Sequence, residues 1–235
     1  MSPFQAVDQD RLYERVARQV ADLVARGDLK PGERLPAERE LARMLGVSRP
    51  TVREAMIALE IAGLVEIRTG SGITVSEAPP SRVVAFDAGP SPHELIAARL
   101  LIEPEIAGLA AAAATPADIA GLRALIEALD ASPDHRASQT VDRAFHVAIA
   151  RACGNSVLIA IVEGLWDRMF SPLFELVSTR TGLPENRRMT LADHRAIVAA
   201  LAARDGAAAR AAMAAHLTHV QTIIVGPNEP SEEVA

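Results

Sequence analysis

The chain has 235 residues, of which 49% are hydrophobic and 3% aromatic, so it can form one large or two modest globular domains with a real core. Its single cysteine excludes an intramolecular disulfide. Its uncharged, alanine-rich stretch of residues 106–117 is too short to span a bilayer, so we expect a cytoplasmic protein with no membrane partner. The net charge of −6 belongs entirely to residues 77–235, because residues 1–76 carry 11 basic and 11 acidic side chains; any contact with nucleic acid must therefore come from a local arginine cluster.

Residues 1–76 are predicted to begin with three helices. Five apolar residues share one face of the first helix, namely Leu12, Val16, Val20, Leu23 and Val24. A short helix over residues 37–45 follows, and Gly46 is expected to make the turn after it. Ser48 can cap a third helix, which Gly63 ends. The buried stripe predicted for this third helix consists of Val52, Ala55, Met56 and Leu59.

Two β-type runs follow these helices. They cover residues 64–68 and 73–77, and the "TGSG" between them is a hairpin signal. Helices followed by a two-stranded hairpin are typical of a winged helix-turn-helix. In that fold the N-terminal end of the recognition helix enters the major groove of DNA.

Several polar residues lie where such a helix would meet DNA. Arg49, Thr51 and Arg53 lie off the buried stripe at the N-terminal end of the third helix, whose positive end also suits phosphate. Arg39 is placed to reach the same DNA strand as these residues, and Gly70 lets the backbone of the wing approach the minor groove. The alternative is a small helical domain in which these residues are only a cap and a solvated face. DNA binding is favoured because four features agree with it: the spacing of the helices, the cap at Ser48, the arginines and the wing.

The stretch "LKPGERLPAERELARMLGVSRPTVREAMIALEIAGLVEIRTGSGITV" resembles the DNA-binding domain of the GntR family of bacterial transcription regulators. The resemblance implies that six residues contact the operator, namely Arg39, Ser48, Arg49, Thr51, Arg53 and Gly70. Because one recognition helix covers only a few base pairs, we expect a homodimer on a two-fold symmetric operator of double-stranded DNA.

A proline-rich stretch, "APPSRVVAFDAGPSP", interrupts any helical or strand period. We place a linker there, over residues 77–92, between a DNA-binding domain of residues 1–76 and a second domain of residues 93–225. Alanine-rich runs such as "GLAAAAAT" favour closely packed helices, so the second domain is predicted to be all-α. The polar, acidic residues 226–235 are expected to be a disordered tail.

Polar side chains lie on the predicted buried stripes of four helices in the second domain. The first of these stripes is Leu95, Arg99, Ile102, Ile106 and Leu109. Asp142 precedes His146 by one helical turn, and His194 and His216 lie on two further apolar stripes. Because an unpaired buried polar group is costly, each of these residues needs a partner or a ligand.

Two interpretations of this polar set remain open from the pattern. Each histidine taken alone is most simply a core imidazole bonded to a backbone carbonyl. One carboxylate and three imidazoles together are a ligand set for Zn²⁺ or another divalent transition metal. His219 competes for the last ligand position, although it lies at the edge of its stripe.

The stretches "ELIAARLLIEPEIAGLAA", "DRAFHVAIARACGNSVL" and "DHRAIVAALAARDGAAARAAMAAHL" resemble the FCD effector domain of the FadR branch of the same family. The resemblance implies an antiparallel all-α helical bundle, so the chain as a whole should be mainly α. It also implies that Asp142, His146, His194 and His216 hold a divalent metal, with Zn²⁺ as first choice and Ni²⁺ or Mn²⁺ as alternatives.

Arg99 matches a recurrent arginine that can take the carboxylate or a hydroxyl of a small effector, and its alternative role is an ion pair with Glu103 at i, i+4. Asn155, Trp166 and Arg168 are expected to add selectivity. The branch-level likeness is greatest to repressors that respond to hexuronates, so a sugar acid is the expected effector.

We therefore expect a ligand-responsive transcriptional regulator, and more specifically a repressor of sugar-acid catabolism that a small carboxylate releases from its operator. One alternative is a metal-dependent hydrolytic enzyme fused to a DNA-binding domain, because three His and an Asp could activate water. It is disfavoured because no carboxylate lies in a motif beside the ligands as a general base. The other alternative is a DNA-binding dimer that responds to no ligand. It is disfavoured because such a protein would not need polar residues on the buried stripes of its helices.

Overall fold

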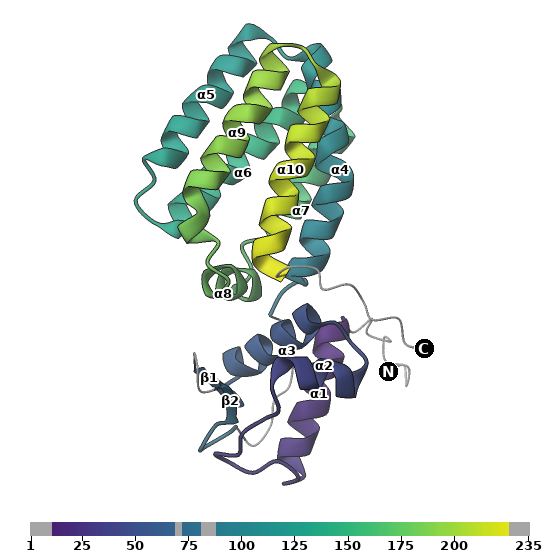
Figure 1. Ribbon diagram of the computed structural model, residues 1–235, viewed down its shortest axis with the longest axis vertical. Coiled ribbons are helices and arrows are strands. Elements are labelled where there is room, and N and C mark those ends of the chain that lie inside the picture. Colours follow the sequence, from purple (N-terminus) through teal and green to yellow (C-terminus); the bar gives the residue numbers. More distant parts are fainter. Residues whose placement is uncertain (1–10, 69–71, 81–87, 226–235) are drawn as a thin grey trace, which may run out of the picture. The chain divides into compact units, whose positions relative to one another are not determined.

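The structure, a computed structural model, describes residues 11–68, 72–80 and 88–225 (Figure 1). The chain separates into two compact units, which are described one at a time. The first comprises residues 1–91 with 171–176, and the second comprises residues 92–170 with 177–235. The expected tail, the wing residue Gly70 and the linker residues 81–87 lie outside the described residues.

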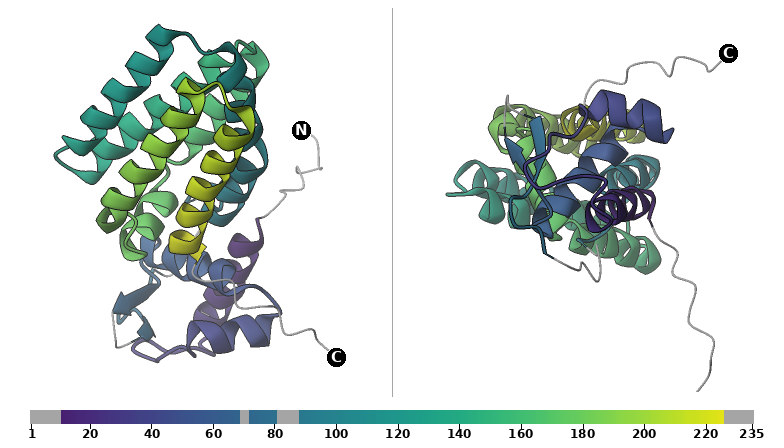
Figure 2. Two further views of the ribbon diagram at one scale, coloured as in Figure 1. Left: turned by 45° about the horizontal axis from the view of Figure 1, so that its top comes forward. Right: turned by 90° about the horizontal axis from the view of Figure 1, so that it is seen from below.

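The first unit is the predicted winged helix-turn-helix (Figures 1 and 2). Its elements are α1 (Leu12–Ala25), α2 (Glu38–Leu45), α3 (Arg49–Ile61), β1 (Val65–Arg68) and β2 (Gly72–Val75). The core-facing side of α1 is formed by Tyr13, Val16, Ala17 and Val20. The prediction for Leu12 was wrong, because its side chain is 43% exposed and Tyr13 takes its place in the core.

The start of α3 follows from the side chain of Ser48, whose oxygen accepts a hydrogen bond from the backbone N–H of Thr51. The four residues predicted as its buried stripe are all inaccessible to solvent. The helix ends at Ile61 with Ala62 as its C-cap, and Gly63 follows with a φ of 74°, a conformation that favours glycine.

Strands β1 and β2 pair antiparallel, with Val65 opposite Val75 and Arg68 opposite Gly72. The second edge of β2 is also covered, because Leu35 donates its N–H to the carbonyl of Ile73. The wing is therefore attached to the segment that precedes α2 by backbone hydrogen bonds.

The second unit is the predicted antiparallel helical bundle (Figures 1 and 2). Its elements are α4 (Pro92–Ala113), α5 (Pro116–Asp130), α6 (His135–Ala152), α7 (Ser156–Arg168), part of α8 (Pro172–Arg180), a 3₁₀ turn (Pro184–Asn186), α9 (Arg187–Ala202) and α10 (Gly206–Val225). Helix α10 packs against both α4 and α9, and α6 packs against α4, α5 and α7. Among the described residues, no helix is long and apolar enough to cross a membrane.

Small residues let α4 and α10 approach closely. A Cβ atom added at Gly206 would lie 3.0 Å from the carbonyl oxygen of Gly108. The core side of α4 is shifted from the predicted stripe, because Leu109 is 52% exposed while Ile96, Ala107 and Ala110 are fully buried. Arg99 nevertheless lies inside this core, at 1% exposure.

Candidate functional site

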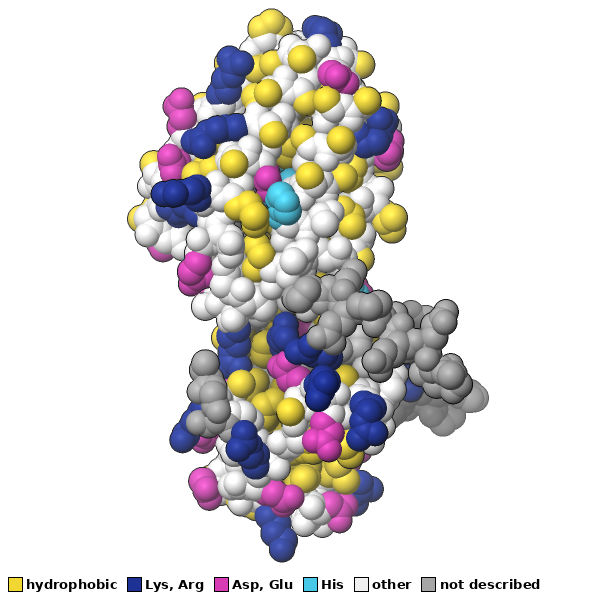
Figure 3. Space-filling model, viewed as in Figure 1, with side chains coloured by type: hydrophobic (Ala, Val, Ile, Leu, Met, Phe, Trp, Pro, Cys, Tyr) yellow, Lys and Arg dark blue, Asp and Glu magenta, His cyan; other side chains and the backbone are white. Residues whose placement is uncertain are grey.

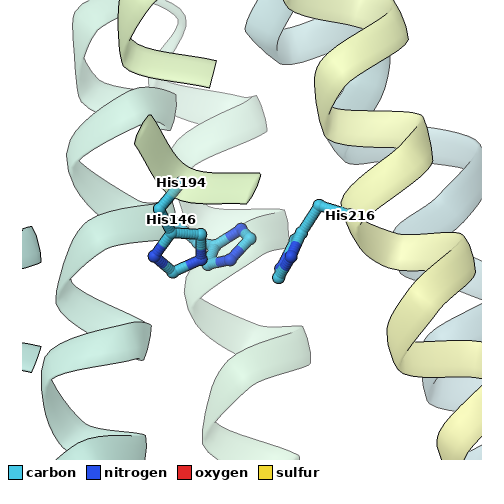
Figure 4. A group of neighbouring side chains, drawn as sticks. All are labelled: His146, His194 and His216. Carbon is cyan, nitrogen blue, oxygen red and sulfur yellow. The ribbon is translucent and has the colours of Figure 1, made fainter. Parts of the chain in front are cut away.

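Three helices of the bundle bring three histidines together in its interior (Figure 4). His146 comes from α6, His194 from α9 and His216 from α10, and each is at most 2% exposed. One nitrogen of each ring lies within 4.8 Å of one nitrogen of the other two. Three rings that are distant in sequence therefore point their nitrogens into one small volume.

Apolar packing holds two of these rings. Phe145, the neighbour of His146 on α6, stacks on the His194 ring at a centroid distance of 4.0 Å. On α10, His216 lies on a stripe whose other members, Met213, Leu217 and Val220, are buried. The histidines occupy core positions because their helices bury the faces that the helical period indicates.

Asp142 lies beside the same group, one turn before His146. Its Oδ1 atom is 3.6 Å from Nε2 of His146 and 3.3 Å from Nε2 of His194. This oxygen is shielded from solvent and has no hydrogen-bond partner among the described residues. A buried ionised group requires a compensating partner, and this oxygen has none in the part of the chain that the structure describes. Burial therefore raises the pKa of Asp142 to about 6.

The histidines themselves are short of partners. Both ring nitrogens of His194 and both ring nitrogens of His216 are buried without a hydrogen bond to any residue that the structure describes. Burial lowers the pKa of His146, His194 and His216, so the imidazoles are neutral and have lone pairs to donate. Three neutral imidazoles and one carboxylate are a donor set that fits a divalent transition metal.

Arg99 and Glu103 of α4 adjoin this set. Nε of Arg99 is 2.6 Å from Oε1 of Glu103, and both side chains are almost completely buried. The other carboxylate oxygen, Oε2, is 2.5 Å from Nδ1 of His146. Burial alone would raise the pKa of Glu103, but the adjacent guanidinium holds it well below its usual range. The ion pair that was the alternative role of Arg99 is therefore present.

The remaining side of the Arg99 guanidinium has weaker contacts. Its carbon lies 4.1 Å from the ring centroid of Trp166, a cation–π arrangement. Its Nη1 is 3.3 Å from the sulfur of Met169, a weak acceptor, and its Nη2 is 3.4 Å from both ring nitrogens of His146. Trp166 thus contacts Arg99, and its ring centroid lies 4.9 Å from that of His146.

Two residues expected to add selectivity have their contacts elsewhere. Asn155 is exposed and caps α7, where its side-chain oxygen accepts from the N–H groups of Val157 and Leu158. Arg168 is exposed and donates to the carbonyl of Gly164 in its own helix. The structure does not bring either residue to the histidines.

Two acidic residues contact the histidines and were not predicted as site residues. Glu103 was considered only as a partner of Arg99, and Asp193 was not considered. Asp193 Oδ2 lies 3.5 Å from Nδ1 of His216 and 2.8 Å from Nδ1 of His219. His219 is half exposed and bonds to Asp193, not to the cluster. The only sequence signals were the i, i+4 spacing of Arg99 and Glu103 and the adjacency of Asp193 to His194.

The first unit carries the second candidate site, at the N-terminal end of α3. Arg49, the first residue of α3, is exposed, as is Arg39 of α2. Thr51 is only 9% exposed, and its hydroxyl lies 2.7 Å from that of Ser48. Arg53 donates to Glu38 of α2 at 3.2 Å. In Figure 3 basic and acidic side chains are interspersed over the face of this unit that is in view. The face in view thus shows no broad positive patch among the described residues, in keeping with the neutral charge of residues 1–76.

Both units match known domains. Residues 12–75 match the family described as bacterial regulatory proteins, gntR family, and residues 94–219 match the FCD domain. The chain is 40% identical over 227 residues to the Uxu operon transcriptional regulator of Escherichia coli K12, an alignment that covers 92% of this chain and 88% of the relative. It is 39% identical over 233 residues to the Exu regulon transcriptional regulator of the same strain, covering 95% and 87%.

A solved structure agrees with this match. The protein described as E. coli McbR/YncC is 27% identical, its alignment covers 92% of this chain and 98% of that chain, and the TM-score is 0.50.

Proposed function

The chain belongs to the GntR family of bacterial regulatory proteins and is a transcriptional regulator with an FCD domain, and from that premise we propose that it is a repressor of sugar-acid catabolism. In this proposal a small carboxylate binds in the helical unit and lowers the affinity of the protein for its operator. The related proteins are regulators and not enzymes, so the hydrolase alternative is dropped.

We assign operator binding to the N-terminal end of α3 and its surroundings. The proposed contacts are Arg39, Ser48, Arg49, Thr51, Arg53 and Gly70. The exposure of Arg39 and Arg49 supports this assignment, as does the positive end of the α3 helix. A homodimer would place two such helices on the half-sites of a two-fold symmetric operator.

We assign one divalent metal ion, with Zn²⁺ as first choice, to Asp142, His146, His194 and His216. The observation that carries this assignment is the convergence of three buried imidazoles, of which His194 and His216 have no hydrogen-bond partners for their ring nitrogens among the described residues. When bound, such an ion supplies a Lewis-acid position for a carboxylate or hydroxyl of the effector.

Charge links an anionic effector to the metal. Without a metal, the ionised Asp142, Glu103 and Asp193 outnumber Arg99, so the site carries two net negative charges; a divalent ion makes it neutral. The metal-free site therefore repels an acid, and the bound ion removes that repulsion. Because Glu103 already occupies the Nε side of Arg99, the effector carboxylate is expected on the Nη1 side, where Met169 is a weak competitor.

A hexuronate is the first-choice effector, since its carboxylate and hydroxyl groups suit both the ion and the guanidinium. The likeness to the Uxu and Exu regulators supports that choice. The effector shifts the operator equilibrium only by its different affinity for the free and the DNA-bound protein. We propose that the linker at residues 77–92 transmits that difference.

A thermal-shift screen of sugar acids tests this proposal, because a ligand that binds only the folded protein raises its melting temperature. Hexuronates are compared with the corresponding neutral hexoses, on protein with and without Zn²⁺. Stabilisation by hexuronates only in the presence of metal supports the proposal. Equal stabilisation by acids and neutral sugars, or none by any acid, contradicts it.

A further inference from the structure

Two carboxylates that are not in the proposed ligand set contact its histidines, and both do so through Nδ1. Glu103 of α4 reaches Nδ1 of His146 on α6, at 2.5 Å. Oδ2 of Asp193 on α9 lies 3.5 Å from Nδ1 of His216 on α10, an ion-pair distance without the geometry of a hydrogen bond. Each contact crosses from one helix to a neighbour, and each leaves Nε2 of the ring on the opposite side.

A neutral imidazole carries its proton on one nitrogen and its lone pair on the other. A carboxylate at Nδ1 favours the proton there, which leaves the Nε2 lone pair for a metal and makes the ring a stronger donor. We propose that Glu103 and Asp193 are positioning residues for the metal, and that they set His146 and His216 to bind it through Nε2. This inference rests on the metal site proposed above.

The positions of the other ligands agree with this choice of nitrogen. Asp142 Oδ1 lies 3.6 Å from Nε2 of His146 and 3.3 Å from Nε2 of His194. The Nε2 atoms therefore lie on the side of the rings that faces the aspartate. A metal bound through Nδ1 of His146 would displace Glu103 from its hydrogen bond and leave its buried charge with Arg99 alone.

Asp193 is held in place from its other side. The same Oδ2 atom accepts from Nδ1 of His219, at 2.8 Å, and the His219 side chain is 44% exposed. His219 is thus bonded to the positioning carboxylate and lies at the surface. This arrangement provides a matched control, because His219 and His216 share one carboxylate but only His216 belongs to the proposed ligand set.

The test measures the affinity of the full chain for Zn²⁺ by competition with a chelator of known affinity. Asp193→Asn keeps the size of the side chain and removes its charge, and we expect it to weaken Zn²⁺ binding by about 10- to 100-fold. His219→Gln keeps Asp193 and should bind Zn²⁺ like the wild type. Glu103→Gln should weaken binding as well; if the loss of the partner of Arg99 prevents folding of that variant, Asp193→Asn decides the matter.

Two readouts separate positioning from a general loss of structure. Metal-free Asp193→Asn is expected to unfold at the temperature of the metal-free wild type. Its Co²⁺-loaded form is expected to show a shifted visible absorption band, because the donor strength of His216 changes. Unaltered Zn²⁺ affinity and an unaltered Co²⁺ spectrum in Asp193→Asn, with a wild type that binds one ion, would overturn this inference and leave the metal site intact. A wild type that binds no ion would overturn the metal site itself, and this inference with it.

Discussion

Arg53 of α3 and Glu38 of α2 form a hydrogen-bonded ion pair, with Nη2 of the arginine 3.2 Å from Oε2 of the glutamate. Both side chains are about a quarter exposed, so the pair is accessible from solvent and is expected to add little stability. It holds the guanidinium at the end of the helix that is proposed to enter the major groove.

We predict that Arg53→Ala weakens operator binding by about 1–3 kcal/mol, the cost of losing a bidentate contact to a base. Fluorescence anisotropy with operator DNA at fixed salt measures this. Arg43→Ala, at an exposed position of α2 that is not among the proposed contacts, is the control and should lose much less. If Arg53→Ala binds the operator as tightly as the wild type, the assignment of α3 as recognition helix is wrong.

The purified protein is predicted to contain about one divalent transition metal ion per chain, as expected for a site built from three His and one Asp. His194→Ala removes a ligand whose described contacts, apart from stacking on Phe145, are with the other proposed ligands, so it should lower metal occupancy. Elemental analysis of protein never exposed to a chelator measures occupancy. His219→Ala should retain the ion. Metal-free wild type that gains no thermal stability from Zn²⁺, Ni²⁺ or Mn²⁺ would leave these residues as ordinary core histidines.

Removal of Arg99 alone is predicted to be strongly destabilising. In Arg99→Ala the charge of Glu103 stays buried without its main partner, and breaking a buried pair in this way typically costs about 3–5 kcal/mol. The double variant Arg99→Ala with Glu103→Ala should lose less than the sum of the two single variants. Denaturant unfolding of all four proteins gives this comparison, and strict additivity would show that the pair is not coupled.

Two glycines of the helical unit should respond to alanine in opposite directions. At Gly206 a Cβ atom would lie 3.0 Å from the backbone oxygen of Gly108, so Gly206→Ala is predicted to destabilise by about 1–3 kcal/mol. At Gly121, inside α5, nothing lies within 4 Å of the new atom, and Gly121→Ala is predicted to stabilise by about 0.4–1 kcal/mol. Thermal unfolding of the two variants checks both signs. A stabilised Gly206→Ala would mean that the contact between α4 and α10 is looser than described.

The sequence predicts the proposed metal ligands because each helix buries one face, and a polar residue on that face must enter the core. Asp142 and His146 are neighbours on one helix, and His194 and His216 lie on apolar stripes of two others. The N-cap at Ser48 can also be predicted from the sequence, since it depends only on residues within one helical turn.

The helical spacing of apolar residues does not determine which side chains of neighbouring helices meet. The bond from Glu103 to His146 depends on how α4 packs on α6, and the contact from Asp193 to His216 depends on how α9 packs on α10. Leu109 was wrongly placed on the buried face for the same reason, because the close approach of α10 shifts the core side of α4.

The central claim is that a sugar acid, bound with a metal ion in the helical unit, releases the protein from DNA. Its most direct test is the dissociation constant for operator DNA, measured by anisotropy at fixed salt as hexuronate is added to the Zn²⁺-loaded protein, with the neutral hexose and the metal-free protein as controls. We predict that the dissociation constant rises with hexuronate, by about tenfold for each 1.4 kcal/mol of coupling, and only in the metal-loaded protein. A dissociation constant that hexuronates leave unchanged, or that rises equally with the neutral hexose or without metal, would contradict the account.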